Sequence, residues 1–233
     1  MQQTGNTMTL TEARHEASTV FLAKVFNWMA IGLGLTGVVA WFTASSGLAI
    51  QLQAYFMYIM LAELGMVFYL SARISKIQAS TATGLFIAYA LLNGLTLSMI
   101  FLIYTQSSIA ATFFITAGMF GSMAVYGLVT KRDLSGMGSF MFMGLIGVLI
   151  ASVVNIFLKS SSLYWAISLI GVLVFVGLTA YDVQKIKTMG EQGIMEQGGE
   201  AVKKGAIMGA LTLYLDFINL FLMLLRFFGG SRD

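Results

Sequence analysis

Long apolar runs separated by short polar segments dominate this chain. Seven runs reach about 20 residues, the length that a helix needs to cross the hydrocarbon core of a bilayer. They lie at residues 25–45, 54–73, 80–104, 109–130, 136–158, 163–183 and 205–228. A six-helix interpretation would need one run to be re-entrant. The pattern therefore predicts an all-α membrane protein with seven transmembrane helices.

Only one connecting segment is long. Residues 184–204 hold several Lys, Glu and Gly residues, and we expect them to form a solvated, mobile cytoplasmic loop. Residues 1–24 lack an apolar stretch of signal-peptide length, and we expect them to form a short cytoplasmic head. The expected organisation is this head followed by one seven-helix transmembrane domain over residues 25–233.

The distribution of Lys and Arg predicts the orientation, because cytoplasmic loops carry an excess of these residues. With a cytoplasmic N-terminus, three cations fall outside, at Lys159, Arg226 and Arg232. The other ten of the 13 fall inside, at Arg14, Lys24, Arg73, Lys76, Lys131, Arg132, Lys185, Lys187, Lys203 and Lys204. We therefore expect a cytoplasmic N-terminus and an external C-terminus.

The composition excludes several classes of protein. The chain is 58% hydrophobic and 10% charged, whereas soluble domains are about 25% charged. This excludes soluble enzymes, nucleic-acid-binding proteins and disordered proteins. The chain has no Cys and a single His, His15, which removes disulfides, Cys-based or paired-His metal sites and a Ser-His relay. We expect no cofactor and no enzymatic activity.

Three acidic residues fall inside the predicted spans, where a carboxylate costs about 2.5–3.5 kcal/mol. Glu63 and Asp216 lie near the middle of the second and seventh spans, Asp182 lies near the cytoplasmic end of the sixth, and Arg73 closes the second. Such acids face the interior of the helix bundle or a water-filled cavity, which marks them as candidate functional residues. Plainer interpretations are an interfacial charge for Asp182, a packing role for Glu63 and a snorkelling anchor for Arg73.

Asp182 and Asp216 form a candidate pair if their helices are adjacent. Two carboxyl groups in a poorly hydrated site share a proton rather than ionise together. The pair would be a proton-sensitive latch, closed with the proton shared and split by repulsion when both groups ionise. The same oxygens are candidate calcium ligands, and Arg73 could pair with one of them. Because Asp216 lies about 18 Å along a helix from Lys204, the pair meets only if the seventh helix begins early or the sixth continues past Asp182.

Two segments resemble the helix motifs of a known family. The stretches LYLDFINLF at 213–221 and LLRFFG at 224–229 resemble the last helix of the transmembrane Bax inhibitor motif family, in its bacterial branch. AYDVQKI at 180–186 resembles the sixth-helix motif of that family, and Glu63 and Arg73 fall where its second helix carries an acid and a base. The long 184–204 connector is a departure from the family.

The resemblance implies a fold of six helices around a central seventh helix, in the bacterial inner membrane. It further implies a pH-sensitive calcium leak channel in which Asp182 and Asp216 are the sensing pair. Arg73 then takes part in gating, and Glu63 lies on the ion path. The expected partners are the lipid bilayer and the calcium ion.

Two alternative functions stay open. Some bacterial relatives bind and modulate a membrane-embedded AAA protease, which makes a regulator acting through residues 1–24 the first alternative. A more remote alternative is an intramembrane aspartyl protease, which also places two aspartates on neighbouring helices. Against it, the chain has no Pro for the Pro-Ala-Leu turn of such proteases, and Asp216 is preceded by Tyr-Leu rather than by Gly-x-Gly.

Overall fold

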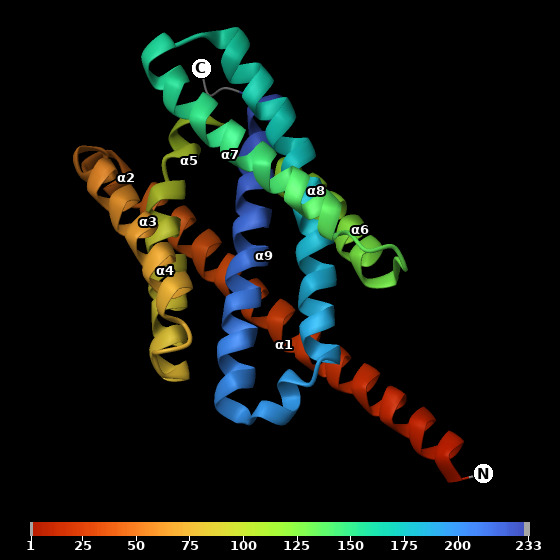
Figure 1. The fold of residues 1–233 in the computed structure, drawn as a ribbon. Coiled ribbons are helices and arrows are strands. Elements are labelled where there is room, and N and C mark those ends of the chain that lie inside the picture. The colour runs from red at the N-terminus through yellow and green to blue at the C-terminus, as the bar shows by residue number, and fades with distance from the viewer. Residues whose placement is uncertain (1, 231–233) are drawn as a thin grey trace. The chain divides into compact units, whose positions relative to one another are not determined.

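All the secondary-structure elements are helices in the part of the chain that the computed structural model describes, which is residues 2–230 with the side chains of residues 12 and 14–230. In chain order the elements are α1 (Gln2–Ser45), α2 (Leu48–Leu52), η1 (Gln53–Tyr55), α3 (Phe56–Arg73), α4 (Ala79–Leu97), α5 (Ile100–Ile103), α6 (Gln106–Val129), α7 (Ser135–Leu158), α8 (Ser161–Glu191), η2 (Ile194–Gln197) and α9 (Gly199–Phe228) (Figure 1).

Seven segments of the described residues are long and apolar enough to cross a membrane. They are Arg14–Ser45, Leu48–Arg73, Ala79–Ile103, Gln106–Val129, Ser135–Leu158, Ser161–Glu191 and Gly199–Phe228. Each contains most or all of one predicted apolar run. The prediction of an all-α membrane protein with seven spans is therefore confirmed.

The chain folds into two compact units, which are described separately. The first comprises the chain up to Leu102 together with Lys185–Tyr214, and the second comprises Ile103–Gln184 together with the chain from Leu215 onward. Helices α8 and α9 contribute residues to both units. Glu63 and Arg73 belong to the first unit, and Asp182 and Asp216 belong to the second.

Aromatic side chains fill the core of the first unit. Phe86 of α4 is fully buried, with its ring centroid 6.5 Å from that of Trp28 in α1 and 6.0 Å from that of Tyr214 in α9. The Thr36 hydroxyl of α1 donates a hydrogen bond to the Ala90 carbonyl of α4, at 2.8 Å. These contacts hold α1, α4 and the first part of α9 together.

The second unit packs around the last part of α9. The ring centroid of Phe217 lies 5.4 Å from that of Phe113 and 5.5 Å from that of Phe120, both in α6. The Thr105 N–H donates to the Gly230 carbonyl at 3.1 Å, and the Gly230 N–H donates to the Ser108 hydroxyl at 2.9 Å. The start of α6 therefore fixes the chain just beyond α9.

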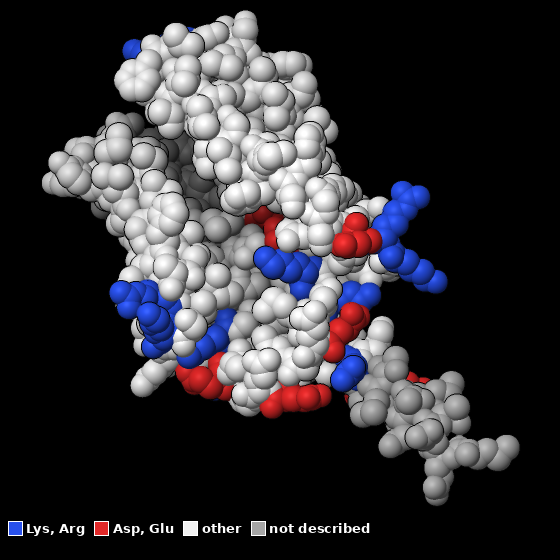
Figure 2. Space-filling view, in the orientation of Figure 1, with Lys and Arg blue, Asp and Glu red and all other residues white. Residues whose placement is uncertain are grey.

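Burial differs sharply among the spans. In α9, 72% of the most apolar window is buried, against 6% in α7. The high burial of α9 is the pattern expected of a central helix, and the exposed apolar side chains of α7 suit contact with lipid tails. Charged side chains cover little of the surface drawn in Figure 2, which suits a chain surrounded mostly by lipid.

The structure corrects the expected loop at residues 184–204. Helix α8 continues to Glu191, and α9 begins at Gly199, so the connector is short and contains η2. These residues are ordered because their pattern is amphipathic. Ile186, Ile194 and Val202 are buried, while Lys187 and Glu191 form an ion pair at 3.7 Å on the more exposed face of α8. The chain reverses at Gly193, whose φ of 85° favours glycine.

The N-terminal head is not separate from the first span, because α1 runs continuously from Gln2 to Ser45. Within it, Ser18 and Phe21 are buried, and the Ser18 hydroxyl donates to the Lys187 carbonyl of α8 at 3.0 Å. The side chains at Glu12 and His15 are exposed. The head is therefore anchored from about Ser18 onward.

Candidate functional site

Asp182 of α8 and Asp216 of α9 are in contact in the second unit. Asp216 is only 5% exposed, Asp182 is half-buried, and their side chains are hydrogen-bonded to each other. Ionised carboxylates only accept hydrogen bonds, so this contact requires a proton on one of the two groups. The Oδ2 atom of Asp216 is buried without a hydrogen-bond partner among the described residues. One carboxyl oxygen of the pair is therefore a buried acceptor that no described residue uses.

The length of the two helices explains how the pair meets. Helix α8 continues past Asp182 to Glu191, and α9 begins at Gly199, well before Lys204. The sequence allows Asp182 and Asp216 to meet only if the seventh helix begins early or the sixth continues past Asp182, and the structure shows both features. The amphipathic ends that replace the expected loop are what position the pair.

Two glycines bring neighbouring helices close to the Asp182 segment. A Cβ at Gly127 of α6 would collide with the Ala180 carbonyl oxygen, and a Cβ at Gly138 of α7 would collide with the Tyr181 ring. Helices α6 and α7 therefore approach α8 immediately before Asp182. This packing restricts where the Asp182 side chain can lie, because interiors at native density have little room to move.

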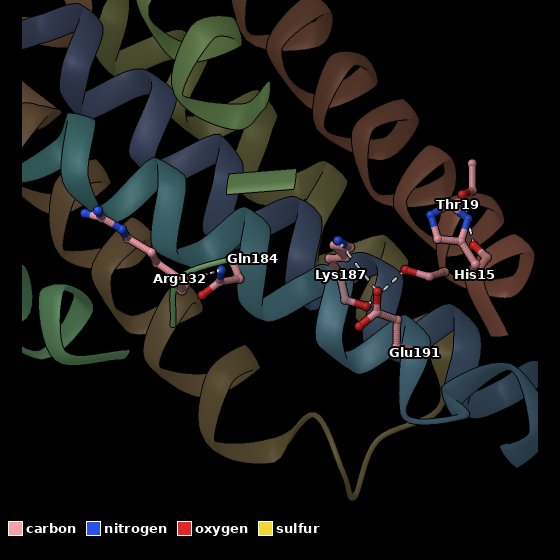
Figure 3. Close-up of polar contacts among 7 residues, drawn as sticks. His15, Thr19, Arg132, Gln184, Lys187 and Glu191 are labelled. Atoms are coloured by element: carbon pink, nitrogen blue, oxygen red, sulfur yellow. Dashed lines mark hydrogen bonds and ion pairs between the residues drawn. The ribbon is translucent and has the colours of Figure 1, made fainter. Parts of the chain in front are cut away.

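Gln184, two residues after Asp182, ties α8 to the loop between α6 and α7. Its Nε2 donates to the Arg132 carbonyl at 2.8 Å (Figure 3). Its Oε1 accepts from the Leu134 N–H at 2.8 Å. A side-chain amide can make both bonds at once because it has a donor and an acceptor. Gln184 therefore fixes the turn between α6 and α7 next to the pair.

The same loop carries an exposed acid, Asp133. Its Oδ1 accepts a hydrogen bond from the Ser135 N–H at 2.9 Å, at the start of α7. Hydrogen bonds from the Ser135 side chain and backbone lower the pKa of Asp133 below its ordinary value. Asp133 is therefore a carboxylate at the start of a helix, where a negative charge is favoured.

Glu63 of α3 lies in a polar cluster of the first unit. It is 7% exposed, its Oε1 accepts from the Thr96 hydroxyl, and its Oε2 lies 3.4 Å from the donating Asn93 Nδ2. Asn93 Nδ2 also lies 3.5 Å from the Tyr89 hydroxyl, and Asn93 Oδ1 is buried without a partner among the described residues. Glu63 is therefore satisfied by neighbours on α4.

Aromatic packing extends this cluster to α9 and α1. The rings of Tyr89 and Tyr214 lie 5.7 Å apart, and the Tyr214 hydroxyl shares a 2.6 Å hydrogen bond with the Thr36 hydroxyl. None of these partners was singled out from the sequence. Asn93 could have been, because an amide inside an apolar run needs a partner in lipid.

Arg73 is the last residue of α3, and its side chain is exposed. Its carbonyl accepts hydrogen bonds from the N–H groups of Lys76 and Ile77, at 2.8 Å and 3.1 Å, which form the turn after the helix. A basic side chain at a helix end suits a position at the membrane edge. Its part in gating stays a prediction.

The described residues offer little for a resident metal. No group of three or more His, Cys, Asp or Glu side chains among them could hold a metal ion. Calcium prefers six to eight oxygen ligands, and the candidate ligands Asp182 and Asp216 supply two carboxyl groups. Two carboxyl groups alone supply fewer oxygen atoms than a calcium ion ordinarily takes.

Comparison with known proteins identifies the family. The model described as "Inhibitor of apoptosis-promoting Bax1" (Bax1-I) matches residues 18–233. The chain is 54% identical over 216 residues to the "Inner membrane protein YbhL" of Escherichia coli K12, covering 91% of this chain and 92% of the relative. It is 50% identical to a Rickettsia prowazekii protein, covering 91% and 90%, and 48% identical to one from Borreliella burgdorferi, covering 91% and 93%. The resemblance read from the two motifs is thus confirmed, and this seven-helix membrane protein belongs to the Bax inhibitor-like family.

Proposed function

We propose that this protein is a passive cation conduit of the inner membrane, with calcium as its cation and the Asp182–Asp216 pair as its proton-sensitive gate. The observation that carries the proposal is the hydrogen bond between two carboxyl groups on two membrane-spanning helices. The name of the Escherichia coli relative supports the inner membrane as the location. The positive-inside rule supports a cytoplasmic N-terminus.

The gate works through the charge on the pair. While one proton is shared, a hydrogen bond joins α8 to α9 next to the tight contacts of Gly127 and Gly138. Loss of that proton leaves two like charges, which repel by about 4 kcal/mol at about 4 Å in an effective dielectric of about 20. The freed carboxylates then present oxygens of the kind that calcium prefers. Opening therefore increases as the pH rises.

Glu63 and Arg73 have accessory roles in this proposal. Glu63 presents a buried carboxyl group that Thr96 and Asn93 hold in place, which suits a residue on an ion path. Arg73 is exposed at the end of α3 and suits gating at the cytoplasmic mouth. Neither residue is needed for the proton to be shared, so their substitution changes the rate of flux more than its pH dependence.

A second candidate function is regulation of a membrane protease through the N-terminal head. The supporting observation is the length of α1, which at 44 residues is about 66 Å long against a hydrocarbon core of about 30 Å. Its exposed side chains at Glu12, Arg14, His15 and Glu16 are available to a partner. A deletion of residues 2–13, which spares the buried Ser18, removes this role and leaves calcium flux intact.

Calcium flux into proteoliposomes over about pH 5–8 tests the gate. Wild-type flux is expected to rise with pH, whereas Asp182→Asn and Asp216→Asn each give a flat profile. Asp133→Asn is the matched control, because Asp133 is an exposed acid in a loop, and it keeps the wild-type profile. Absence of flux at every pH, or an unchanged profile in Asp216→Asn, overturns the proposal. Cleavage of a transmembrane peptide that both variants lose would instead favour a protease.

A further inference from the structure

The first unit contains a cavity of about 880 Å³ that the proposed function does not use. Side chains from α1, α4 and α9 line it, among them Lys24, Trp28, Ser80, Ile87, Lys203 and Ile207. Ligand sites in proteins commonly enclose about 300–1,000 Å³. The cavity is therefore large enough for a small amphipathic molecule.

The cavity lies where three spans begin. Ala79 is the first residue of α4, Glu200 is the second residue of α9, and both line the cavity. The first, third and seventh spans of a seven-helix protein start on the same side of the membrane. The charge distribution assigns that side to the cytoplasm. The cavity therefore opens at the cytoplasmic edge of the bilayer.

Two lysines give the cavity a positive mouth. Lys24 and Lys203 are exposed, and neither forms an ion pair within the described part of the chain. The one acidic residue of the lining, Glu200, is already paired: its Oε1 accepts from the Ala79 N–H at the start of α4, at 2.7 Å, and lies 3.6 Å from Lys204 Nζ. Charge complementarity at this mouth therefore favours an anion.

The rest of the lining is suited to a hydrocarbon chain and its polar attachment. Trp28 is half-buried, Ile87 is half-buried and Ile207 is fully buried, so they form an apolar wall behind the lysines. The exposed Ser80, in the first turn of α4, adds a hydroxyl group to the lining. A small anion without a hydrocarbon chain would contact the lysines but not this apolar wall.

We propose that this cavity binds an anionic phospholipid of the cytoplasmic leaflet. Lys24 and Lys203 contact its phosphate and headgroup, and Trp28 lies along the upper part of an acyl chain. A lipid explains the cationic mouth, the apolar wall and the position at the membrane edge together. The proposal is independent of the gate, because none of these residues belongs to the aspartate pair.

Quenching of Trp28 fluorescence by brominated lipid tests the site. The Trp41→Phe/Trp165→Phe variant leaves Trp28 as the single tryptophan of the three. It is reconstituted in vesicles that contain either brominated phosphatidylglycerol or brominated phosphatidylcholine at the same mole fraction. Each lysine near an anionic lipid is worth a factor of about five in binding. We therefore expect phosphatidylglycerol to be preferred by about five-fold if one lysine binds and by about 25-fold if both do.

Charge variants separate the cavity from the general surface charge. Lys24→Gln/Lys203→Gln is expected to abolish the preference, and Lys24→Arg/Lys203→Arg is expected to keep it. Lys76→Gln/Lys131→Gln also removes two positive charges, from loops on the same predicted side of the membrane that do not line the cavity. This control is expected to keep the preference for phosphatidylglycerol. Circular dichroism and elution as a single species show that each variant is folded.

Three outcomes overturn the proposal. Equal quenching by the two lipids would mean that the site does not select anionic lipid. An equal loss in the Lys76→Gln/Lys131→Gln control would mean that surface charge alone concentrates the lipid. Removal of the preference by inorganic phosphate at about 10 mM, beyond what the same concentration of chloride does, would mean that the mouth takes a soluble anion instead.

Discussion

Replacing Gly127 with alanine tests the contact that holds the Asp182 segment in place. A Cβ at this position would meet the Ala180 carbonyl oxygen, with the carbonyl carbon at 3.2 Å and the Cα at 3.3 Å. These are backbone atoms of α8, which cannot rotate away as the end of a side chain can. The methyl group therefore forces α6 and α8 apart, two residues from Asp182.

The expected cost follows from this geometry. Overpacking of a tight contact typically destabilises a protein by about 1–3 kcal/mol. Gly121→Ala on the same helix is the matched control, because a Cβ there has nothing within 4 Å. That control gains up to about 1 kcal/mol from helix propensity. Gly127→Ala gains the same propensity, so this gain cancels, and the free energies of unfolding of the two variants should differ by the overpacking cost of about 1–3 kcal/mol.

Unfolding in mixed micelles, titrated with a denaturing detergent and followed by circular dichroism, measures this difference. Gly127→Ala should unfold at a lower fraction of denaturing detergent than wild type, and Gly121→Ala at an equal or higher one. Because the separation of α6 from α8 moves Asp182, the pH profile of calcium flux should also change in Gly127→Ala alone. Equal stability of both variants would refute the close contact on which the position of Asp182 rests.

Three further variants test single interactions of the structure. Tyr214→Phe removes the 2.6 Å bond to Thr36 but keeps the ring, and should lower the free energy of unfolding by about 0.5–1.5 kcal/mol in the same titration. Gln184→Leu removes both bonds to the loop after α6, and protease cleavage of that loop should become faster. Ser135→Ala should raise the pKa of Asp133 toward its ordinary value, as followed by the carboxyl carbon chemical shift. Since the pKa of Asp133 is lowered in the folded protein, its stabilising contribution is present above the ordinary pKa and is lost as the pH falls through the folded value.

Much of the fold follows from the length and spacing of the apolar runs. The seven spans could be predicted because each must satisfy its own backbone in lipid, and this requires about 20 apolar residues. The last turns of α8 and the first turns of α9 could not be predicted in this way. Their Lys and Glu residues look like a loop, but Ile186, Ile194 and Val202 give them a buried face that only packing reveals.

The candidate site, like the fold, could be predicted from the sequence only in part. The cost of an acid in the bilayer is enough to single out Glu63, Asp182 and Asp216 from the sequence. Their partners depend on which helices are neighbours, and no pattern within one helix gives this. The bond of Thr96 to Glu63 and the fit of Gly127 against Ala180 are therefore known only from the structure.

Infrared spectroscopy near pH 7 detects the proton that we propose Asp182 and Asp216 share. A Glu63→Gln background removes the other buried acid of the spans, so that one remaining protonated carboxyl band reports on the pair. A shared proton gives this band in the Glu63→Gln background, and we expect both Asp182→Asn and Asp216→Asn to remove or shift it. A spectrum without a protonated carboxyl group, or a band that neither substitution alters, would contradict the sharing of a proton.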